Sequence, residues 1–317
     1  MKVFEKNLPQ RKYRIPYILI LIILWFGACK EGVLPEKDIE DFRFVFATDI
    51  HLIPQKHAID GFNQAIAAIN GLKPEPHFVI LGGDLVENRY TRTLDNAEKM
   101  FNLYQKITMK FSMPVHNVIG NNDVIRIFDD SGEDSSHPDN DKGLFKRRLG
   151  NGATYRSFDY NGWHYVLLDS LGKTENGAYR GYIDDDQLNW LKNDLEKTGT
   201  ERPVCVALHI PLVTSYIQIE SDNMSAPPRY LVVNNGTKVI KLLSEYNVRL
   251  ILQGHLHIVE EIKYKKTSYI TGGILSGAKW EASSWLGHPN GYVVVDVRGH
   301  EFSWEYQSYK WTLPEKE

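Results

Sequence analysis

The sequence lacks any concentration of basic residues of the kind that binds nucleic acid. Its formal net charge is -3, and lysine and arginine are spread along the 317 residues. A nucleic-acid-binding domain carries a basic patch or stripe instead, so we expect no nucleic-acid partner. From Phe42 onward the chain also has no low-complexity tract and no internal repeat. The hydrophobic content of 42% is ordinary for a globular protein and permits one large α/β domain or two small ones.

An apolar run near the N-terminus is too short to cross a bilayer. Residues 15–28 are about 14 in number, whereas a transmembrane helix needs about 20 apolar residues. The run is preceded by five basic residues, Lys2, Lys6, Arg11, Lys12 and Arg14. Basic residues followed by a short apolar run are typical of a signal peptide, which we expect over residues 1–28.

The residues that end this run resemble the lipobox of bacterial lipoproteins. Gly27 and Ala28 directly precede Cys29, although Phe26 stands where leucine is more usual. We therefore expect an exported protein that is anchored in a bacterial membrane by a lipid on Cys29, on the periplasmic or outer-membrane side. A plain cleaved signal and an uncleaved anchor are the alternatives. The polar residues 29–41 are expected to form a tether.

Cysteine is otherwise almost absent. Cys205 is the only other one in the chain, and it lies in the apolar run "VCVALH". If Cys29 carries a lipid, Cys205 has no partner for an intrachain disulfide. We expect it to be a buried structural thiol.

Short apolar runs alternate with helical periodicity after residue 42, which predicts βαβ units. Strands are expected at 42–47, 77–81, 115–119, 204–208 and 248–253, with helices between them. Residues 154–169 alternate around Asn161-Gly162, a strong hairpin signal. Residues 126–151 are polar and are expected to form a long loop. The pattern predicts two mixed sheets face to face with helices outside, in one domain over 42–310, followed by a tail over 311–317.

Five of the predicted strands are each followed at once by a residue that can bind a metal ion. These residues are Asp49, His51, Asp84, Asn121, His209, His255 and His257. A single Asp or His in such a place is usually a cap or a structural residue. Side chains at the carboxyl ends of strands converge in α/β sheets, however, so the coincidence indicates one site. Mixed oxygen and imidazole ligands favour Mn, Fe, Zn or Co over Ca.

The ordered stretches "DIH", "GGD", "GNND", "ALH" and "GHLH" resemble the motifs of the calcineurin-like metallophosphoesterases. The resemblance covers residues 44 to about 300 and implies a four-layer α/β/β/α sandwich, the metallophosphatase fold, with two divalent metal ions. It implies that one ion is held by Asp49, His51, Asp84 and His257. The second ion would be held by Asp84, Asn121, His209 and His255, with Asp84 as the bridge. The implied substrate is a small phosphorylated molecule.

One position departs from the motif, because Asn122 stands where the family has a histidine that protonates the leaving oxygen. Asn122 can donate a hydrogen bond but cannot give up a proton. The resemblance implies that Asp123 orients the residue at 122. Three interpretations stay open: a hydrolase of esters with good leaving groups, a hydrolase whose acid is another residue such as His288 or His57, and a surface lipoprotein that binds metal and a phosphorylated ligand without turnover.

Other residues are candidates for contact with substrate. Trp280 and Trp285 follow the last metal motif, and Arg180 and Arg126 can bind phosphate, although packing and surface ion pairing are common fates for such residues. From these observations we expect a dinuclear, metal-dependent phosphoesterase. It would cleave a phosphate monoester, a diester or a pyrophosphate with water activated between the metals.

Overall fold

The computed structural model describes residues 40–125, 136–174, 179–220 and 228–314. Residues 38–317 form one compact unit. The predicted signal peptide, Cys29 and nearly all of the predicted tether lie outside the described residues, as does Arg126. Within the described residues, no helix is both long enough and apolar enough to cross a membrane.

The first sheet has five strands in the order β15-β14-β1-β2-β3. Its central strand β1 pairs in parallel with β2, and β2 with β3, while β14 and β15 add an antiparallel edge. The strands are β1 (Phe42–Ala47), β2 (Val79–Leu81), β3 (Val115–Asn117), β14 (Tyr292–Arg298) and β15 (Glu301–Gln307). Because β1, β2 and β3 are parallel, their carboxyl ends meet at one edge of the sheet.

The second sheet has six strands in the order β10-β11-β9-β8-β5-β4. Strands β11, β9, β8 and β5 are parallel to one another, and β10 and β4 are antiparallel edge strands. The strands are β4 (Arg156–Tyr160), β5 (Trp163–Leu167), β8 (Val204–Ala207), β9 (Val248–Gln253), β10 (Val259–Tyr264) and β11 (Thr267–Gly272). The predicted hairpin turn at Asn161 and Gly162 is confirmed, since both residues have positive φ, 40° and 83°.

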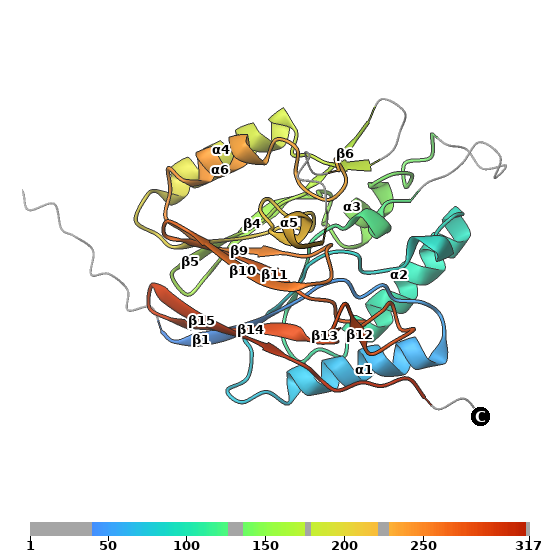
Figure 1. Cartoon of the computed structure of the whole chain (residues 1–317). Coiled ribbons are helices and arrows are strands. Elements are labelled where there is room, and N and C mark those ends of the chain that lie inside the picture. The colour runs from blue at the N-terminus through green and yellow to red at the C-terminus, as the bar shows by residue number, and fades with distance from the viewer. Residues whose placement is uncertain (1–39, 126–135, 175–178, 221–227, 315–317) are drawn as a thin grey trace, which may run out of the picture. The chain divides into compact units, whose positions relative to one another are not determined.

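Four longer helices flank the sheets, with α1 and α2 on the side of β1 and β14 and with α4 and α6 on the other side (Figure 1). They are α1 (Lys56–Asn70), α2 (Leu94–Thr108), α4 (Asp185–Thr198) and α6 (Gly236–Leu243). Side chains cap two of them, because Thr93 accepts a hydrogen bond from the amide of Asn96 and Asp184 accepts one from Gln187. The short elements are η1 (Asn88–Tyr90), η2 (Asn121–Asp123), α3 (Gly143–Arg148), β6 (Leu171–Lys173), β7 (Tyr179–Gly181), α5 (Tyr216–Glu220), β12 (Ser284–Trp285) and β13 (His288–Pro289).

Alternate side chains of each strand enter different cores, which makes the sandwich. In β1, Phe44 and Phe46 belong to the core between the sheets, whereas Val45 packs into the core under the helices. In β8 of the other sheet, Cys205 faces the inner core and Val206 the outer one. The structure is thus the expected four-layer α/β/β/α sandwich of two mixed sheets flanked by helices. Cys205 is buried, as the sequence predicts.

Two boundaries differ from the sequence prediction. The expected loop over 126–151 contains α3, which forms because Leu144 and Phe145 are buried in a mainly polar segment. Trp311, which was placed in the tail, is also buried and packs edge to face on Trp280. The folded domain therefore extends past residue 310, since the ring of Trp311 is part of the core.

Candidate metal centre

Five strands deliver the predicted ligands to one end of the sandwich. Asp49 and His51 follow β1, and Asp84 follows β2. The segments after β1 and β2 are joined by backbone hydrogen bonds, from the amide of Asp49 to Gly83 at 3.1 Å and from His51 to Asp84 at 2.8 Å. The segments after β8 and β9 are joined in the same way, because the amide of Gly254 donates to His209 at 2.9 Å. These bonds continue the strand pairing beyond the strands and fix the ligand positions.

The backbone of five predicted ligands adopts the left-handed region. The φ angles are 58° at Asp49, 44° at His51, 51° at Asp84, 74° at His255 and 60° at His257. Positive φ is uncommon for residues other than glycine, and such residues cluster at functional sites. Here the positive φ turns the backbone sharply after each strand, so that the ligand side chain projects into the site.

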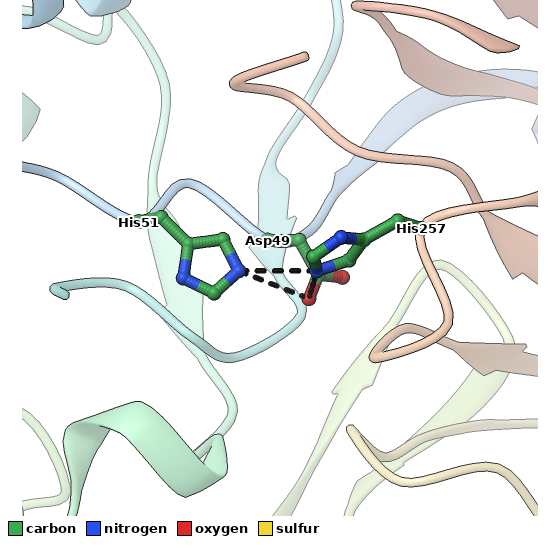
Figure 2. Close-up of side chains that lie close together, drawn as sticks. All are labelled: Asp49, His51 and His257. Atoms are coloured by element: carbon green, nitrogen blue, oxygen red, sulfur yellow. Dashed lines mark hydrogen bonds and ion pairs between the residues drawn. The ribbon is translucent and has the colours of Figure 1, made fainter. Parts of the chain in front are cut away.

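Asp49, His51 and His257 form the first cluster, in which the imidazole rings converge on the carboxylate (Figure 2). His257 Nε2 lies 3.1 Å from Asp49 Oδ1 and 3.1 Å from His51 Nε2. His51 Nε2 lies 3.7 Å from the same carboxylate oxygen. All three side chains are buried. The facing nitrogen and oxygen atoms are suitably placed to surround one cation.

Asp84, His209 and His255 form the second cluster. His209 Nε2 lies 3.2 Å from Asp84 Oδ1, and the other oxygen of Asp84 lies 3.6 Å from His51 Nε2 of the first cluster. Asp84 therefore lies between the clusters, with one carboxylate oxygen facing each. Six of the seven predicted metal ligands are accounted for in these two groups.

The seventh predicted ligand, Asn121, lies in η2 beside this end of the sheet. Its side chain is buried, and the Oδ1 atom has no hydrogen-bond partner. Burying an unpaired polar atom is costly, and Asp49 Oδ1 and His209 Nε2 also lack partners of good geometry. Divalent cations would satisfy these atoms, so the residues present fit a dinuclear metal centre with oxygen and imidazole ligands.

Three of the histidines are oriented through the ring nitrogen that faces away from the clusters. His209 Nδ1 lies 2.9 Å from the carbonyl of Gly82, and His255 Nε2 lies 2.9 Å from the carbonyl of Tyr230. His51 Nδ1 lies 3.1 Å from Glu87 Oε2. The last of these contacts is an ion pair without hydrogen-bond geometry, whereas the two carbonyl contacts are hydrogen bonds. Contacts of this kind orient the ring and leave the other nitrogen for a metal ion. With these orientations, Nε2 of His51 and His209 and Nδ1 of His255 would be the atoms available to a metal ion.

Sequence reasoning did not identify Glu87. Its carboxylate is buried beside His51 and also lies 3.1 Å from Lys279 Nζ. The available signal was an acidic residue three positions after Asp84 in "GGDLVEN". An acidic residue at this spacing is common and does not by itself indicate a metal site. Only the fold shows that Glu87 reaches His51.

The electrostatics of the site favour bound cations. Although burial alone would raise it, the charges of His257 and His209 hold the pKa of Asp49 well below its usual range. The pKa of Asp84 is also lowered, against the effect of burial, chiefly by the charge of His209. Burial lowers the pKa of His51, but the carboxylates of Asp49 and Glu87 overcome this and raise it to about 9. The buried carboxylates are thus ionised beside positively charged histidines, and bound cations would displace the protons of those rings.

Close approach of the loops requires glycine at two points. A Cβ atom at Gly120 would lie 2.0 Å from the amide nitrogen of Asp84 and 2.4 Å from its Oδ1. A Cβ atom at Gly254 would lie 2.2 Å from Thr48 Oγ1. These glycines allow the segments after β3 and β9 to approach the carboxylates.

The residues of the third motif have clear partners. Asn122 donates to both oxygens of Asp84, from its backbone amide to Oδ1 at 2.7 Å and from Nδ2 to Oδ2 at 2.5 Å. Asp123 is fully buried and accepts hydrogen bonds from the amides of Leu85, Val86 and Gly120. The resemblance implied that Asp123 orients residue 122. These bonds from the backbone brace the turns that carry Asp84 and Asn121.

The structure corrects one prediction for the substrate-contacting residues. Trp280 is fully buried, and its Nε1 donates to the carbonyl of Ile50 at 2.8 Å. It therefore supports the loop from inside the core and cannot touch substrate. Trp285 is exposed and packs edge to face on His257, with ring centroids 5.6 Å apart.

The other proposed substrate residue, Arg180, stacks over the ring of Tyr182 at 4.3 Å. Of the two alternative acids, His57 lies in the first turn of α1, and His288 lies in β13 paired with Trp285. His288 Nδ1 is 3.4 Å from the amide of Val259. None of these contacts places His57 or His288 beside Asp84, where a general acid would be needed.

Comparison with solved structures agrees with this architecture. A dimetal phosphatase from Danio rerio superposes with a TM-score of 0.58 at 15% identity, covering 85% of this chain and 99% of that one. GAP50, described as the anchor in the inner membrane complex of Plasmodium, gives a TM-score of 0.53 at 15% identity and covers 85% of each chain. At these identities the likeness concerns the fold, which is that of the metallophosphatases.

The sequence profile of the calcineurin-like phosphoesterases matches residues 42–259, more than half of the chain. The chain therefore belongs to the calcineurin-like phosphoesterase family. This agrees with the two clusters of carboxylate and imidazole groups at the strand ends.

Curated relatives of this chain include two phosphodiesterases. A 3′,5′-cyclic-nucleotide phosphodiesterase of Nostoc sp. is 24% identical over 218 residues, which cover 66% of this chain and 69% of the relative. The 3′,5′-cyclic adenosine monophosphate phosphodiesterase CpdA of Pseudomonas aeruginosa is 34% identical over 100 residues, 31% of this chain and 32% of the relative. Purple acid phosphatase 18 of Arabidopsis thaliana is 32% identical over 117 residues, 36% of this chain and 23% of the relative.

Proposed function

We propose that this protein is a metal-dependent phosphodiesterase that hydrolyses a small phosphodiester at the two clusters. The observation that carries the proposal is the position of Asp84, whose two oxygens face His209 in one cluster and His51 in the other. A carboxylate between two sets of ligands suits a pair of divalent ions, drawn from Mn, Fe, Zn and Co. The names of two curated relatives support a diester over a monoester or a pyrophosphate.

Two divalent ions, when bound, supply the positive charge that polarises a phosphoryl group and the means to activate water at neutral pH. The protein's own groups hold that arrangement. Thr48 donates to Asp49 Oδ2 at 2.8 Å, and the amide of His255 donates to the same oxygen at 2.9 Å, which leaves Oδ1 free to bind. These bonds keep the carboxylate in one orientation, so the site is organised before substrate arrives.

Asn122 limits the proton chemistry of the site. Its amide can donate hydrogen bonds but carries no proton that it can transfer at neutral pH. A phosphodiester with a stable leaving group suits such a site best, because a leaving oxygen of low pKa departs without general acid catalysis.

The proposal is tested with protein that has been stripped with a chelator and reloaded with Mn²⁺. We expect metal-dependent cleavage of bis(4-nitrophenyl) phosphate, and 3′,5′-cyclic AMP is the first natural diester to assay. Asp84→Ala should abolish cleavage and remove at least one bound metal ion, since it deletes the group between the clusters. Two bound Mn²⁺ ions per chain without any cleavage would favour a non-catalytic, ligand-binding protein instead.

We further propose that the protein is exported and is anchored to a bacterial membrane by a lipid on Cys29. The support is the order of basic residues, apolar run and "FGAC" at the N-terminus. Several acyl chains on one cysteine would hold the protein stably, whereas a single chain binds only marginally.

A further inference from the structure

An exposed aromatic side chain borders the first cluster. Trp285 is 40% exposed, and its ring lies edge to face with His257 at a centroid distance of 5.6 Å. Leu286, the next residue, is also exposed. Most large apolar side chains of the described residues are buried, so an exposed tryptophan in contact with a candidate metal ligand needs an explanation.

The hairpin that carries Trp285 is preorganised. Strands β12 and β13 pair Trp285 with His288 across a two-residue turn in which Leu286 and Gly287 have φ angles of 46° and 82°. Positive φ at both central residues is typical of the tight hairpin turn whose twist matches its strands. The tryptophan is therefore held in place before any ligand binds.

The base of the hairpin is tied to the first metal motif. Ser276 Oγ donates to the carbonyl of Asp49 at 2.9 Å, and the amide of Trp280 donates to Ser276 at 2.9 Å. After the hairpin, Asn290 is buried and donates to the carbonyl of Trp311 at 2.8 Å. The segment that leads into the hairpin is thus tied by hydrogen bonds to the backbone of Asp49.

Aromatic rings also border the second cluster. Tyr179 lies edge to face with His255 at 6.4 Å, and Tyr230 lies 6.5 Å from Tyr179. The carbonyl of Tyr230 orients His255. Tyr230 itself is 49% exposed. Each cluster therefore has an aromatic surface beside it, which a charged phosphoryl group alone does not require.

We propose that Trp285 binds the planar aromatic part of the substrate, either a nucleobase that is joined to the phosphoryl group through its sugar or an aryl group that is joined to it directly. The inference rests on the proposed function, because it assumes that the phosphoryl group binds between the clusters. A planar ring stacks on an aromatic side chain with little sequence or substituent preference, and the gain is commonly about 5- to 100-fold in affinity. The substrate class is accordingly a phosphate ester that carries a planar aromatic group, rather than the phosphate of a simple sugar or a simple alkyl phosphate.

Equilibrium binding measurements can distinguish the contribution of the planar group to affinity from that of the phosphoryl group. The Mn²⁺-loaded protein is titrated by calorimetry with phenylphosphonate and with methylphosphonate, which carry the same charged group and are not hydrolysed. We expect the unaltered protein to prefer phenylphosphonate by about 10-fold. Trp285→Ala should remove that preference while methylphosphonate still binds, and Trp285→Phe should retain most of it.

Two controls distinguish stacking from a structural role. Tyr264→Ala removes an exposed aromatic ring at the far end of β10 and should leave both affinities unchanged. The Mn²⁺ content of Trp285→Ala should equal that of the unaltered protein. Loss of metal together with equal weakening of both phosphonates would overturn the inference, because Trp285 would then merely support His257.

The remaining outcomes are also decisive. Equal binding of both phosphonates by the unaltered protein, or a preference that survives in Trp285→Ala, would overturn the inference while the proposed function stands. Failure of both phosphonates to bind the metal-loaded protein would contradict the proposed function itself, because the charged phosphoryl group is the part that the two ligands share.

Discussion

Asn122 binds both oxygens of Asp84, through its backbone amide at 2.7 Å and its side-chain amide at 2.5 Å. The side chain that replaces the histidine of the family motif thus holds the carboxylate that lies between the two clusters. Residues that orient metal ligands commonly contribute 10- to 100-fold to metal affinity. The change at this position therefore has a structural consequence as well as a chemical one.

Asn122→Ala should weaken metal binding. The substitution removes the bond from Nδ2 but leaves the backbone bond to Asp84, so we expect a loss of about 10-fold, at the lower end of the range for such contacts. Calorimetric titration with Mn²⁺ measures it. Asn117→Ala is a useful comparison, because that asparagine lies in β3 and its Oδ1 accepts a hydrogen bond from the hydroxyl of Tyr104. An Asn122→Ala protein with unchanged Mn²⁺ affinity would show that the contact does not organise the site.

Asn122→His should change the dependence of rate on the leaving group. At saturating metal we expect alkyl phosphate esters to be cleaved about 10-fold faster, since a high-pKa alkoxide needs a proton and histidine can supply one. Nitrophenyl esters should change little. The measurement compares kcat for methyl and 4-nitrophenyl esters. An equal gain in both would point to altered metal geometry. A loss on both would mean that the hydrogen bond from the Asn122 side chain to Asp84 matters more than a proton donor at this position.

Glu87→Ala should reduce metal affinity through His51. The carboxylate lies 3.1 Å from His51 Nδ1, and its loss removes the partner that orients the ring. We expect about 10-fold weaker Mn²⁺ binding, as for other groups that orient a metal-binding histidine. Metal titration measures the change, and Glu281→Ala, an exposed carboxylate on the same side of the fold, serves as the control. Equal affinities in the two variants would contradict the role of Glu87.

His164→Gln should alter how stability depends on pH. His164 lies between Asp159 at 2.7 Å and Asp194 at 2.9 Å, and Arg202 also binds Asp159. Burial lowers the pKa of His164, but the two carboxylates outweigh burial and raise it. A raised pKa in the folded state gives stability that is fully present below the unfolded pKa of about 6.5 and is lost as pH rises through the folded value.

We therefore expect the unaltered protein to exceed His164→Gln in free energy of unfolding most at about pH 5.5 and least above pH 9. Because a hydrogen bond to a charged group contributes on this scale, we expect the two free energies of unfolding to differ by about 1–2 kcal/mol at the lower pH. Urea denaturation at both pH values measures it. A difference that grows as the pH rises would mean that His164 is neutral in the folded protein.

Cys29→Ser should release the protein from membranes. The substitution removes the site of lipid attachment but lies outside the predicted domain, so the enzymatic domain should keep its stability and its metal content. Fractionation of cells that express each form measures membrane association. Equal retention of the Cys29→Ser protein in membranes would exclude lipid attachment at this residue as the anchor.

The sequence alone was sufficient to predict the layers and the composition of the candidate centre. Short apolar runs mark the strands, and residues that can bind a metal ion directly after five of them mark the edge where the strands meet. These signals are local, because a strand and the residue that follows it are read from a few consecutive letters. The metal-binding chemistry of Asp49, His209 and His257 was therefore predictable without coordinates.

Tertiary structure decided the contacts between distant segments. Trp280 and Trp285 are alike in sequence, yet one is buried under Ile50 and the other is exposed beside His257. Glu87 reaches His51, and Asn122 reaches Asp84, across gaps of more than thirty residues. Such partners depend on how strands pair and loops turn, and neither composition nor periodicity encodes these distances. The sequence determined which chemical groups are present, and packing determined which side chains hold them in place and which tryptophan is left exposed beside them.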